Sequence, residues 1–251
     1  MITYTDPVLH LKDVSLSFGD KRILKDINLL VKDVLGAGQI ITLLGNSGIG
    51  KTQLLKMIAG LQQPTTGEIL IGKELTPVKP GQVGMVLQTY PLFEHRTVIS
   101  NFKLVSQDKD KIAFYADEFS MREHLNKYPC QLSGGQRQRC AIIQQPLCSD
   151  KFILFDEPFS GLDPKAIEKL CRNIRKVANL NEENTVIISS HIIEPSVAIS
   201  DTVIMLQKQE DGVATIGFTV DLVEKGLAWR EDIRKDPTFV ETCEILRNTF
   251  Q

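Results

Sequence analysis

The residues with the clearest chemical potential form a glycine-rich run, Gly45-Asn46-Ser47-Gly48-Ile49-Gly50-Lys51-Thr52. The run fits the pattern G-x-x-x-x-G-K-[ST] at every position. Glycines permit a tight turn whose N–H groups point at phosphate oxygens, and a following helix adds the positive end of its dipole. Lys51 is then expected to reach the β- and γ-phosphates, and Thr52 to offer its hydroxyl to Mg²⁺. The alternative is a glycine-rich strand-to-helix turn that binds nothing.

Further polar residues come directly after apolar strand-like runs, where ligand sites of open α/β sheets gather. These residues are Gln88, Asp156, Glu157 and His191. Beside a phosphate loop in the same sheet, Asp156 is expected to hold Mg²⁺ and Glu157 to act as general base on the attacking water. His191 is expected to donate a hydrogen bond to a γ-phosphate and to orient the water. Alone, the acid pair would fit a helix cap or a turn equally well, and His191 alone would be better explained as an ordinary helix-start histidine.

The bulk composition limits the classes of protein that fit. The chain has 251 residues, 42% hydrophobic and 24% charged, enough for one large domain or two packed lobes. With 29 Lys+Arg against 31 Asp+Glu, the net charge of -2 gives no reason to expect nucleic acid as a partner. The five cysteines lack metal spacing and read as reduced thiols. No secretion-signal layout is visible and no apolar run approaches ~20 residues, which predicts a soluble chain.

The pattern of apolar runs predicts an α/β fold built around the phosphate loop. Alternating runs at 8–18 and 67–72, with a turn at Gly19-Asp20, predict an N-terminal antiparallel β subdomain. Apolar strands that alternate with helical sequence predict a mainly parallel sheet with helices on its faces. Those strands are expected at residues 39–44, 84–87, 152–155, 185–190 and 203–206, with a crossover helix at 164–179. Between Thr89 and Ser149 the composition is mixed and helical, which predicts a second lobe.

The run Leu132-Ser133-Gly134-Gly135-Gln136 is the most specific feature. A serine and two glycines at a helix start form an anion site, although a plain loop before a helix is the alternative. The run resembles the signature of ATP-binding-cassette (ABC) ATPases. The resemblance covers nearly the whole chain, because the phosphate loop, Gln88, the signature, the acid pair, the run from Ser160 to Pro164 and His191 follow in family order.

The resemblance implies a head-to-tail dimer of two ATPase subunits with two sandwiched ATP molecules. Ser133 and Gly135 would serve the partner's nucleotide, and Asp163 would lie at the dimer seam. Gln88 would contact nucleotide and Mg²⁺ and contribute to catalysis. Phe18 falls where the family stacks an aromatic ring on adenine, although core packing is nearly as good an account. The segment after Gln88, which includes Phe93, would receive a helix from a membrane partner, unless it is simply a solvated loop.

The resemblance also fixes an expected division of the chain and marks two departures from the family. Residues 1–88 and 150–220 would form the nucleotide-binding core with its β subdomain, 89–149 the helical subdomain, and 221–251 a C-terminal helical tail. In the tail, Phe239, Val240, Cys243 and Leu246 are expected on one buried helix face. Gln144 replaces a family arginine, and Pro146 is expected to end or kink its helix.

These features together predict an ATP-hydrolysing subunit of an ABC membrane transporter. Its cofactors would be ATP and Mg²⁺, and its partners a second ATPase subunit and transmembrane permease subunits. The expected location is the cytoplasm, peripheral on the cytoplasmic face of the inner membrane. Import of a small solute is the first choice, with an exporter or lipid-transport ATPase as the alternative. A soluble ABC ATPase that remodels a nucleic-acid or protein partner also stays open, and a nucleotide sensor is weaker because Glu157 supplies a general base.

Overall fold

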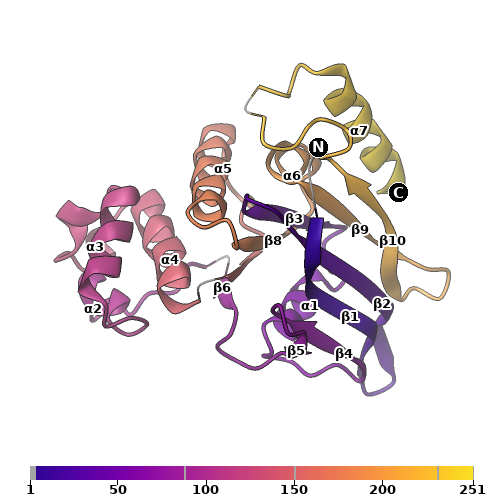
Figure 1. Cartoon of the computed structure of the whole chain (residues 1–251), viewed down its shortest axis with the longest axis horizontal. Coiled ribbons are helices and arrows are strands. Elements are labelled where there is room, and N and C mark those ends of the chain that lie inside the picture. The colour runs from indigo at the N-terminus through magenta and orange to yellow at the C-terminus, as the bar shows by residue number, and fades with distance from the viewer. Residues whose placement is uncertain (1–3, 88, 150, 231, 251) are drawn as a thin grey trace.

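The computed structural model describes residues 4–87, 89–149, 151–230 and 232–250. Its organising element is a ten-stranded sheet in the order β5-β4-β1-β2-β10-β9-β3-β8-β7-β6 (Figure 1). The strands, in chain order, are β1 (Tyr4–Phe18), β2 (Lys21–Val34), β3 (Gln39–Leu44), β4 (Thr66–Ile71), β5 (Thr76–Pro77), β6 (Gly84–Val86), β7 (Phe152–Asp156), β8 (Thr185–Ser190), β9 (Thr202–Lys208) and β10 (Ala214–Asp221). The helices are α1 (Lys51–Ile58), α2 (Val98–Phe102), α3 (Lys109–Glu118), α4 (Gly134–Cys148), α5 (Pro164–Asn179), α6 (Ile193–Ile199) and α7 (Pro237–Thr249), with short 3₁₀ turns at Arg122–His124 and Pro129–Gln131.

The predicted antiparallel and parallel parts are both present, and they are joined in one sheet. β1 pairs antiparallel with β2 and with β4, whereas β6, β7, β8, β3 and β9 run parallel to one another. The two parts meet through β10, a strand that the sequence did not predict separately. It pairs antiparallel with β9 and touches β2 through the single register pair Ala214 and Leu24.

Alternation along the central strands explains the two cores on the two faces of the sheet. Side chains such as Leu154 and Ile187 share a cluster with α1 and the antiparallel strands, so the sheet bends around α1. The intervening residues, such as Phe155 and Ile188, pack against α4 and α5 on the opposite face. Because both faces are covered, the strands are apolar throughout, as the sequence predicted.

The segment after β6 carries α2, α3 and α4, which form a lobe to one side of the sheet (Figure 1). Helix α4 contains Pro146 and ends two residues beyond it, at Cys148, so the expected termination near Pro146 holds. Gln144 donates from its side-chain amide to the carbonyl of Asn101 at the end of α2 (3.3 Å). The residue that departs from the family pattern therefore ties α4 to a neighbouring helix within this lobe.

The last described helix, α7, packs beside α6 and the end of the sheet (Figure 1). Asp236 caps it, with Pro237 in its first turn, and Phe239, Cys243 and Leu246 are buried. Val240 is 44% exposed, so the expectation that it shares the buried face is wrong. Its position, one residue from Phe239, turns it about 100° away around the helix.

Candidate functional site

The phosphate loop lies between strand and helix as predicted. β3 ends at Leu44, the loop follows, and α1 begins at Lys51. Gly50 caps the helix with a φ of 113°, a conformation that L side chains rarely adopt. Gly45 and Ile49 are buried, whereas Asn46, Ser47 and Gly48 form the exposed rim of the loop. The loop therefore combines a rigid base with a rim open to a ligand.

Lys51 is buried, with only 4% of its side chain exposed, and its ammonium group is fully engaged within the chain. Its Nζ donates to the carbonyl of Gly45 (2.7 Å) and to that of Asn46 (3.1 Å). It also forms an ion pair with Glu157 Oε1 at 2.8 Å. An ammonium has three protons to donate, so a phosphate must displace one of these partners.

Asp156 ends β7 and faces the phosphate loop. Its Oδ1 accepts from Thr52 Oγ1 (3.0 Å) and from Ser189 Oγ (2.7 Å). The two residues that the sequence predicted to share Mg²⁺ are thus in direct contact. Ser189 was not predicted as a site residue, and the only signal for it is a polar position near the end of an apolar strand.

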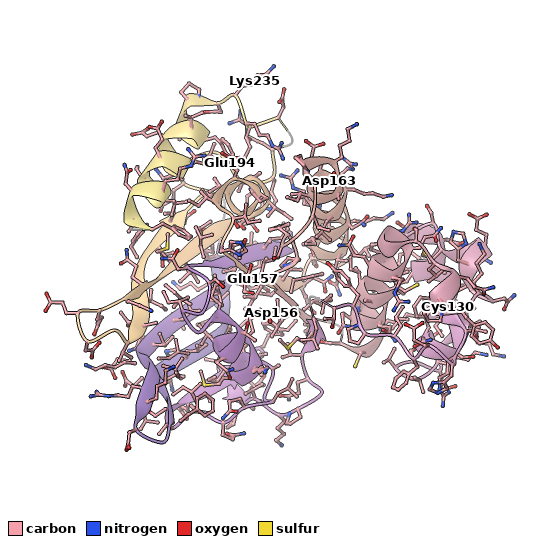
Figure 2. The ribbon with its side chains drawn as sticks, turned by 180° about the vertical axis from the view of Figure 1, so that it is seen from behind. Cys130, Asp156, Glu157, Asp163, Glu194 and Lys235 are labelled. Carbon is pink, nitrogen blue, oxygen red and sulfur yellow. The ribbon has the colours of Figure 1, made fainter. Side chains whose placement is uncertain are left out.

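Glu157 follows β7 in the left-handed region, with φ 48°, which is uncommon for a residue other than glycine. Its N–H donates to the carbonyl of Ser189 (3.2 Å) and to its hydroxyl (2.9 Å). His191 Nδ1 lies 2.8 Å from Glu157 Oε2. Because an ionised carboxylate only accepts, Nδ1 carries the hydrogen of this bond. Figure 2 shows Asp156 and Glu157 close together at the centre of the molecule, by the sheet.

Two predicted nucleotide contacts, Gln88 and Phe18, are not tested by the structure. Gln88, predicted to contact nucleotide and Mg²⁺ and to aid catalysis, lies outside the described residues. Phe18, at the end of β1, is 49% exposed and belongs to none of the core clusters formed by the described residues. Core packing, the alternative account of Phe18, is therefore not observed. Adenine stacking on Phe18 stays a prediction.

The signature run lies at the start of α4, in the lateral lobe. Ser133 is the N-cap of α4, and its hydroxyl accepts from Gln136 N (3.4 Å). Ser133, Gly134 and Gly135 are all exposed. Figure 2 labels Cys130, just before this run, far from Asp156 and Glu157. Among the described residues, no hydrogen bond or ion pair joins the signature run to the phosphate loop.

Asp163 caps α5, where its Oδ1 accepts from Ala166 N (3.0 Å). It is exposed and lies apart from the acid pair in Figure 2. One carboxylate oxygen of Asp163 therefore has a local role, as the N-cap of its own helix. Its predicted place at a dimer seam needs a surface outside this chain, and stays a prediction.

A tyrosine that the sequence did not predict links the signature helix to the acid pair. The Tyr90 hydroxyl accepts from Gln138 Nε2 in α4 (2.7 Å) and donates to the carbonyl of Pro158 (3.4 Å), directly after Glu157. Burial raises the pKa of Tyr90 above its ordinary value near 10, so the hydroxyl stays protonated at neutral pH. No sequence signal distinguishes Tyr90 as a hydrogen-bonding bridge from an aromatic residue that only packs in the core.

The ligands near Asp156 suit Mg²⁺ better than they suit a metal ion that is bound by protein side chains alone. Thr52 and Asp156 offer oxygen ligands, which Mg²⁺ prefers, and this cation commonly relies on substrate phosphates for further coordination. In the parts of the chain that the structure describes, no group of three or more His, Cys, Asp or Glu residues is arranged to hold a metal.

A phosphate loop on a central parallel strand, with an acid pair at the end of the next strand but one, defines a P-loop nucleotide-binding protein. The class narrows further on comparison with known proteins. The family model described as "ABC transporter" matches residues 24–160, and the chain belongs to this family. The resemblance drawn from the signature run is confirmed.

Curated relatives are ATP-binding proteins of importers by name. The sulfate/thiosulfate import ATP-binding protein CysA of Synechococcus elongatus is 35% identical over 209 residues, covering 79% of this chain and 59% of that protein. The spermidine/putrescine import ATP-binding protein PotA of Pasteurella multocida is 33% identical over 220 residues, covering 82% and 58%. The chain thus spans about three fifths of the length of these relatives.

Solved structures confirm the predicted fold. The structure of cbiO1 from Clostridium perfringens, described as part of the ABC transporter complex cbiONQ, superposes with a TM-score of 0.75. The superposition covers 97% of this chain and 100% of cbiO1, and the two sequences are 22% identical. Within the described residues, none of the helices combines the length and the apolar character that a bilayer crossing requires.

Proposed function

We propose that this chain is the ATP-hydrolysing subunit of an ABC membrane transporter that energises import of a small solute through separate membrane subunits. One observation supports the proposal that the chain hydrolyses ATP. The carboxylate of Glu157 lies 2.8 Å from both Lys51 Nζ and His191 Nδ1. A carboxylate held between a phosphate-binding lysine and an imidazole suits a general base. The names of the relatives support import, because CysA and PotA are called import ATP-binding proteins.

The Lys51–Glu157 ion pair suggests how the base becomes available. The phosphates of ATP compete with Glu157 Oε1 for the Lys51 ammonium, because all three of its protons already have acceptors. Nucleotide binding then releases Oε1 to accept a proton from water, while His191 holds Oε2. Thr52 and Asp156 would hold Mg²⁺, which supplies charge neutralisation on the phosphates.

The exposed signature run supports a dimer. Ser133 and the two glycines after it lie at a helix N-terminus, where backbone N–H groups and the helix dipole favour an anion. Head-to-tail pairing of two copies would bring this run against the partner's nucleotide, with Asp163 at the seam. The remaining members of the proposed site are Gln88, Phe18 and the loop residues Gly45 to Thr52.

A membrane partner is proposed at the exposed segment after Gln88. Phe93 is 54% exposed, and Glu94 pairs there with Arg137 of α4. An apolar ring beside a charge pair on the surface suits docking of a helix from a permease subunit. This arrangement would hold the chain peripherally at the cytoplasmic face of the inner membrane. Co-purification with a polytopic membrane protein tests it, and a stable complex with nucleic acid and no membrane subunit would contradict it.

The hydrolytic assignment is tested with Glu157→Gln. The substitution removes the base and weakens the contact with Lys51, so we expect ATP binding to be retained or tightened. Turnover is expected to fall by about 10² or more, in the range that general-base catalysis contributes. Steady-state phosphate release and binding of a fluorescent ATP analogue measure the two effects, and size-exclusion chromatography with MgATP detects a trapped dimer.

The matched control is Glu68→Gln. Glu68 pairs with Lys12 at 3.0 Å in the exposed first half of β4, so its loss is expected to leave both readouts unchanged. Hydrolysis by Glu157→Gln at the wild-type rate would rule out the base assignment.

A further inference from the structure

Ser189 is buried at the point where the two site acids meet. Its side chain is fully buried, and in the register of β7 against β8 it lies opposite Asp156. The other side chains of β8 from Val186 to Ile188 are apolar and serve the two cores. A buried hydroxyl needs hydrogen-bond partners, and those that Ser189 has are both in the candidate site.

The Ser189 hydroxyl joins the acids through one chain of hydrogen bonds. Its Oγ accepts from Glu157 N at 2.9 Å and donates to Asp156 Oδ1 at 2.7 Å. The carboxylate can only accept, which fixes the direction of the hydroxyl proton toward Asp156. One side chain therefore orients the carboxylate of the first acid and the backbone turn of the second.

The turn at Glu157 is where such support matters. Its φ of 48° costs conformational energy for a residue with a side chain, and it persists only when its surroundings hold it. The Ser189 hydroxyl and carbonyl both accept from the Glu157 N–H. Without the hydroxyl, the Glu157 N–H keeps only the longer bond of 3.2 Å to the Ser189 carbonyl.

We propose that Ser189 is a positioning residue that sets the placement of the Mg²⁺-holding carboxylate of Asp156 relative to the general base Glu157. The inference rests on the proposed function. Ser189 acts through its neighbours and contacts no reacting atom. Its neighbour Ser190 shows that the arrangement is specific to one serine, because the Ser190 hydroxyl instead accepts from Ile192 N at 3.0 Å.

The test compares Ser189→Ala with Ser196→Ala. Ser196 is equally buried, and its hydroxyl donates to the carbonyl of Ile192 (2.6 Å), away from the acids. In Ser189→Ala we expect kcat for ATP hydrolysis to fall roughly tenfold, as for other residues that orient a metal-binding carboxylate. The Mg²⁺ concentration for half-maximal binding of a fluorescent ATP analogue is expected to rise severalfold. Binding of the analogue in chelator, without Mg²⁺, is expected to stay unchanged.

Ser196→Ala is expected to lower the melting temperature as much as Ser189→Ala does, without a change in kcat or in the Mg²⁺ requirement. Ser189→Cys covers the case in which the alanine variant does not fold. The thiol fills nearly the same space but is a weak donor and acceptor, so we expect the same two changes.

The outcomes separate this inference from the proposed function. A folded Ser189 variant whose kcat and Mg²⁺ requirement both stay within twofold of wild type would overturn the positioning role and leave the proposed function standing. Wild-type protein that shows no Mg²⁺-dependent nucleotide binding would defeat the proposed function itself, whatever the variants do.

Discussion

The glycines of the phosphate loop and those of the signature run differ in what requires them. A Cβ added at Gly45 would lie 3.1 Å from Ile49 and from the Leu206 carbonyl, and Gly50 has a φ of 113°. At Gly134 and Gly135 an added Cβ would meet no heavy atom of the described chain within 4 Å apart from their sequence neighbours and the backbone of their own helix, and neither has a positive φ. The fold of this chain thus explains Gly45 and Gly50, whereas it leaves Gly134 and Gly135 unexplained.

The second pair is also unfavourable locally. Gly134 and Gly135 open a helix, and glycine is a poorer helix former than alanine, by up to about 1 kcal/mol in a helix interior. Smooth backbone at an exposed helix N-terminus allows an external anion to approach closely. The comparison teaches that the fold itself requires the glycines of the phosphate loop, whereas those of the signature run fit the proposal that another subunit brings the ligand.

The sharpest way to break this comparison uses defects in the two halves. Ser133→Arg places a bulky cation on the signature run, and Lys51→Ala removes the phosphate-binding ammonium. We expect each homogeneous variant to lose hydrolysis by about 10² or more. In a mixed dimer, the intact phosphate loop of one subunit meets the intact signature of the other, so the mixture is expected to recover part of the activity. Phosphate release across mixing ratios measures this.

The contrary result is a mixture with no more activity than the sum of its components, which would place both halves of the site in one subunit. Binding of a fluorescent ATP analogue serves as the control. Ser133→Arg should bind it as wild type does at low protein concentration, because the phosphate loop is untouched, whereas Lys51→Ala should not.

A second substitution sharpens the comparison on the signature side alone. Gly135→Ala adds a methyl group where the chain has open space. We expect the melting temperature to stay the same or rise slightly, because alanine is the better helix former. Hydrolysis is expected to fall about tenfold, because the methyl group obstructs the approach of the partner's nucleotide. Thermal melts and steady-state hydrolysis on the same preparation check both effects.

The matched control on the other half is Gly45→Ala, which should lower the melting temperature because Ile49 and Leu206 leave no room. If Gly135→Ala instead destabilised the protein while hydrolysis per folded molecule stayed normal, the open space at the signature would have no functional meaning.

The contrast between local and long-range contacts also explains what the sequence could predict. The phosphate loop, the strand ending in Asp156 and the helix at 164–179 follow from residue types at fixed local spacing, and the structure has each of them. Ser189 and Tyr90 could not be predicted as site residues, because their roles depend on partners 33 and 48 positions away. β10 was missed because it is half exposed and its pattern is irregular across a register shift. Val240 was misassigned because the predicted buried face of the C-terminal helix included one residue too many beside Phe239.

Tyr90 offers the smallest and most specific test, because its hydroxyl bridges the signature helix α4 and the segment that carries the acid pair. It connects Gln138 of the signature helix with Pro158, next to Glu157.

Tyr90→Phe keeps the ring and removes both hydrogen bonds, each worth about 1 kcal/mol net. We expect kcat to fall about three- to fivefold while binding of a fluorescent ATP analogue to the phosphate loop stays unchanged, since the loop makes no contact with this hydroxyl among the described hydrogen bonds. Tyr4→Phe, which removes a hydroxyl of β1 that donates to Asp221 of β10 at 3.1 Å, is the control and should leave kcat unchanged. Equal kcat in both variants would mean that the signature helix and the acid pair act without this bridge, and coupling between them would then have to pass through the shared apolar core.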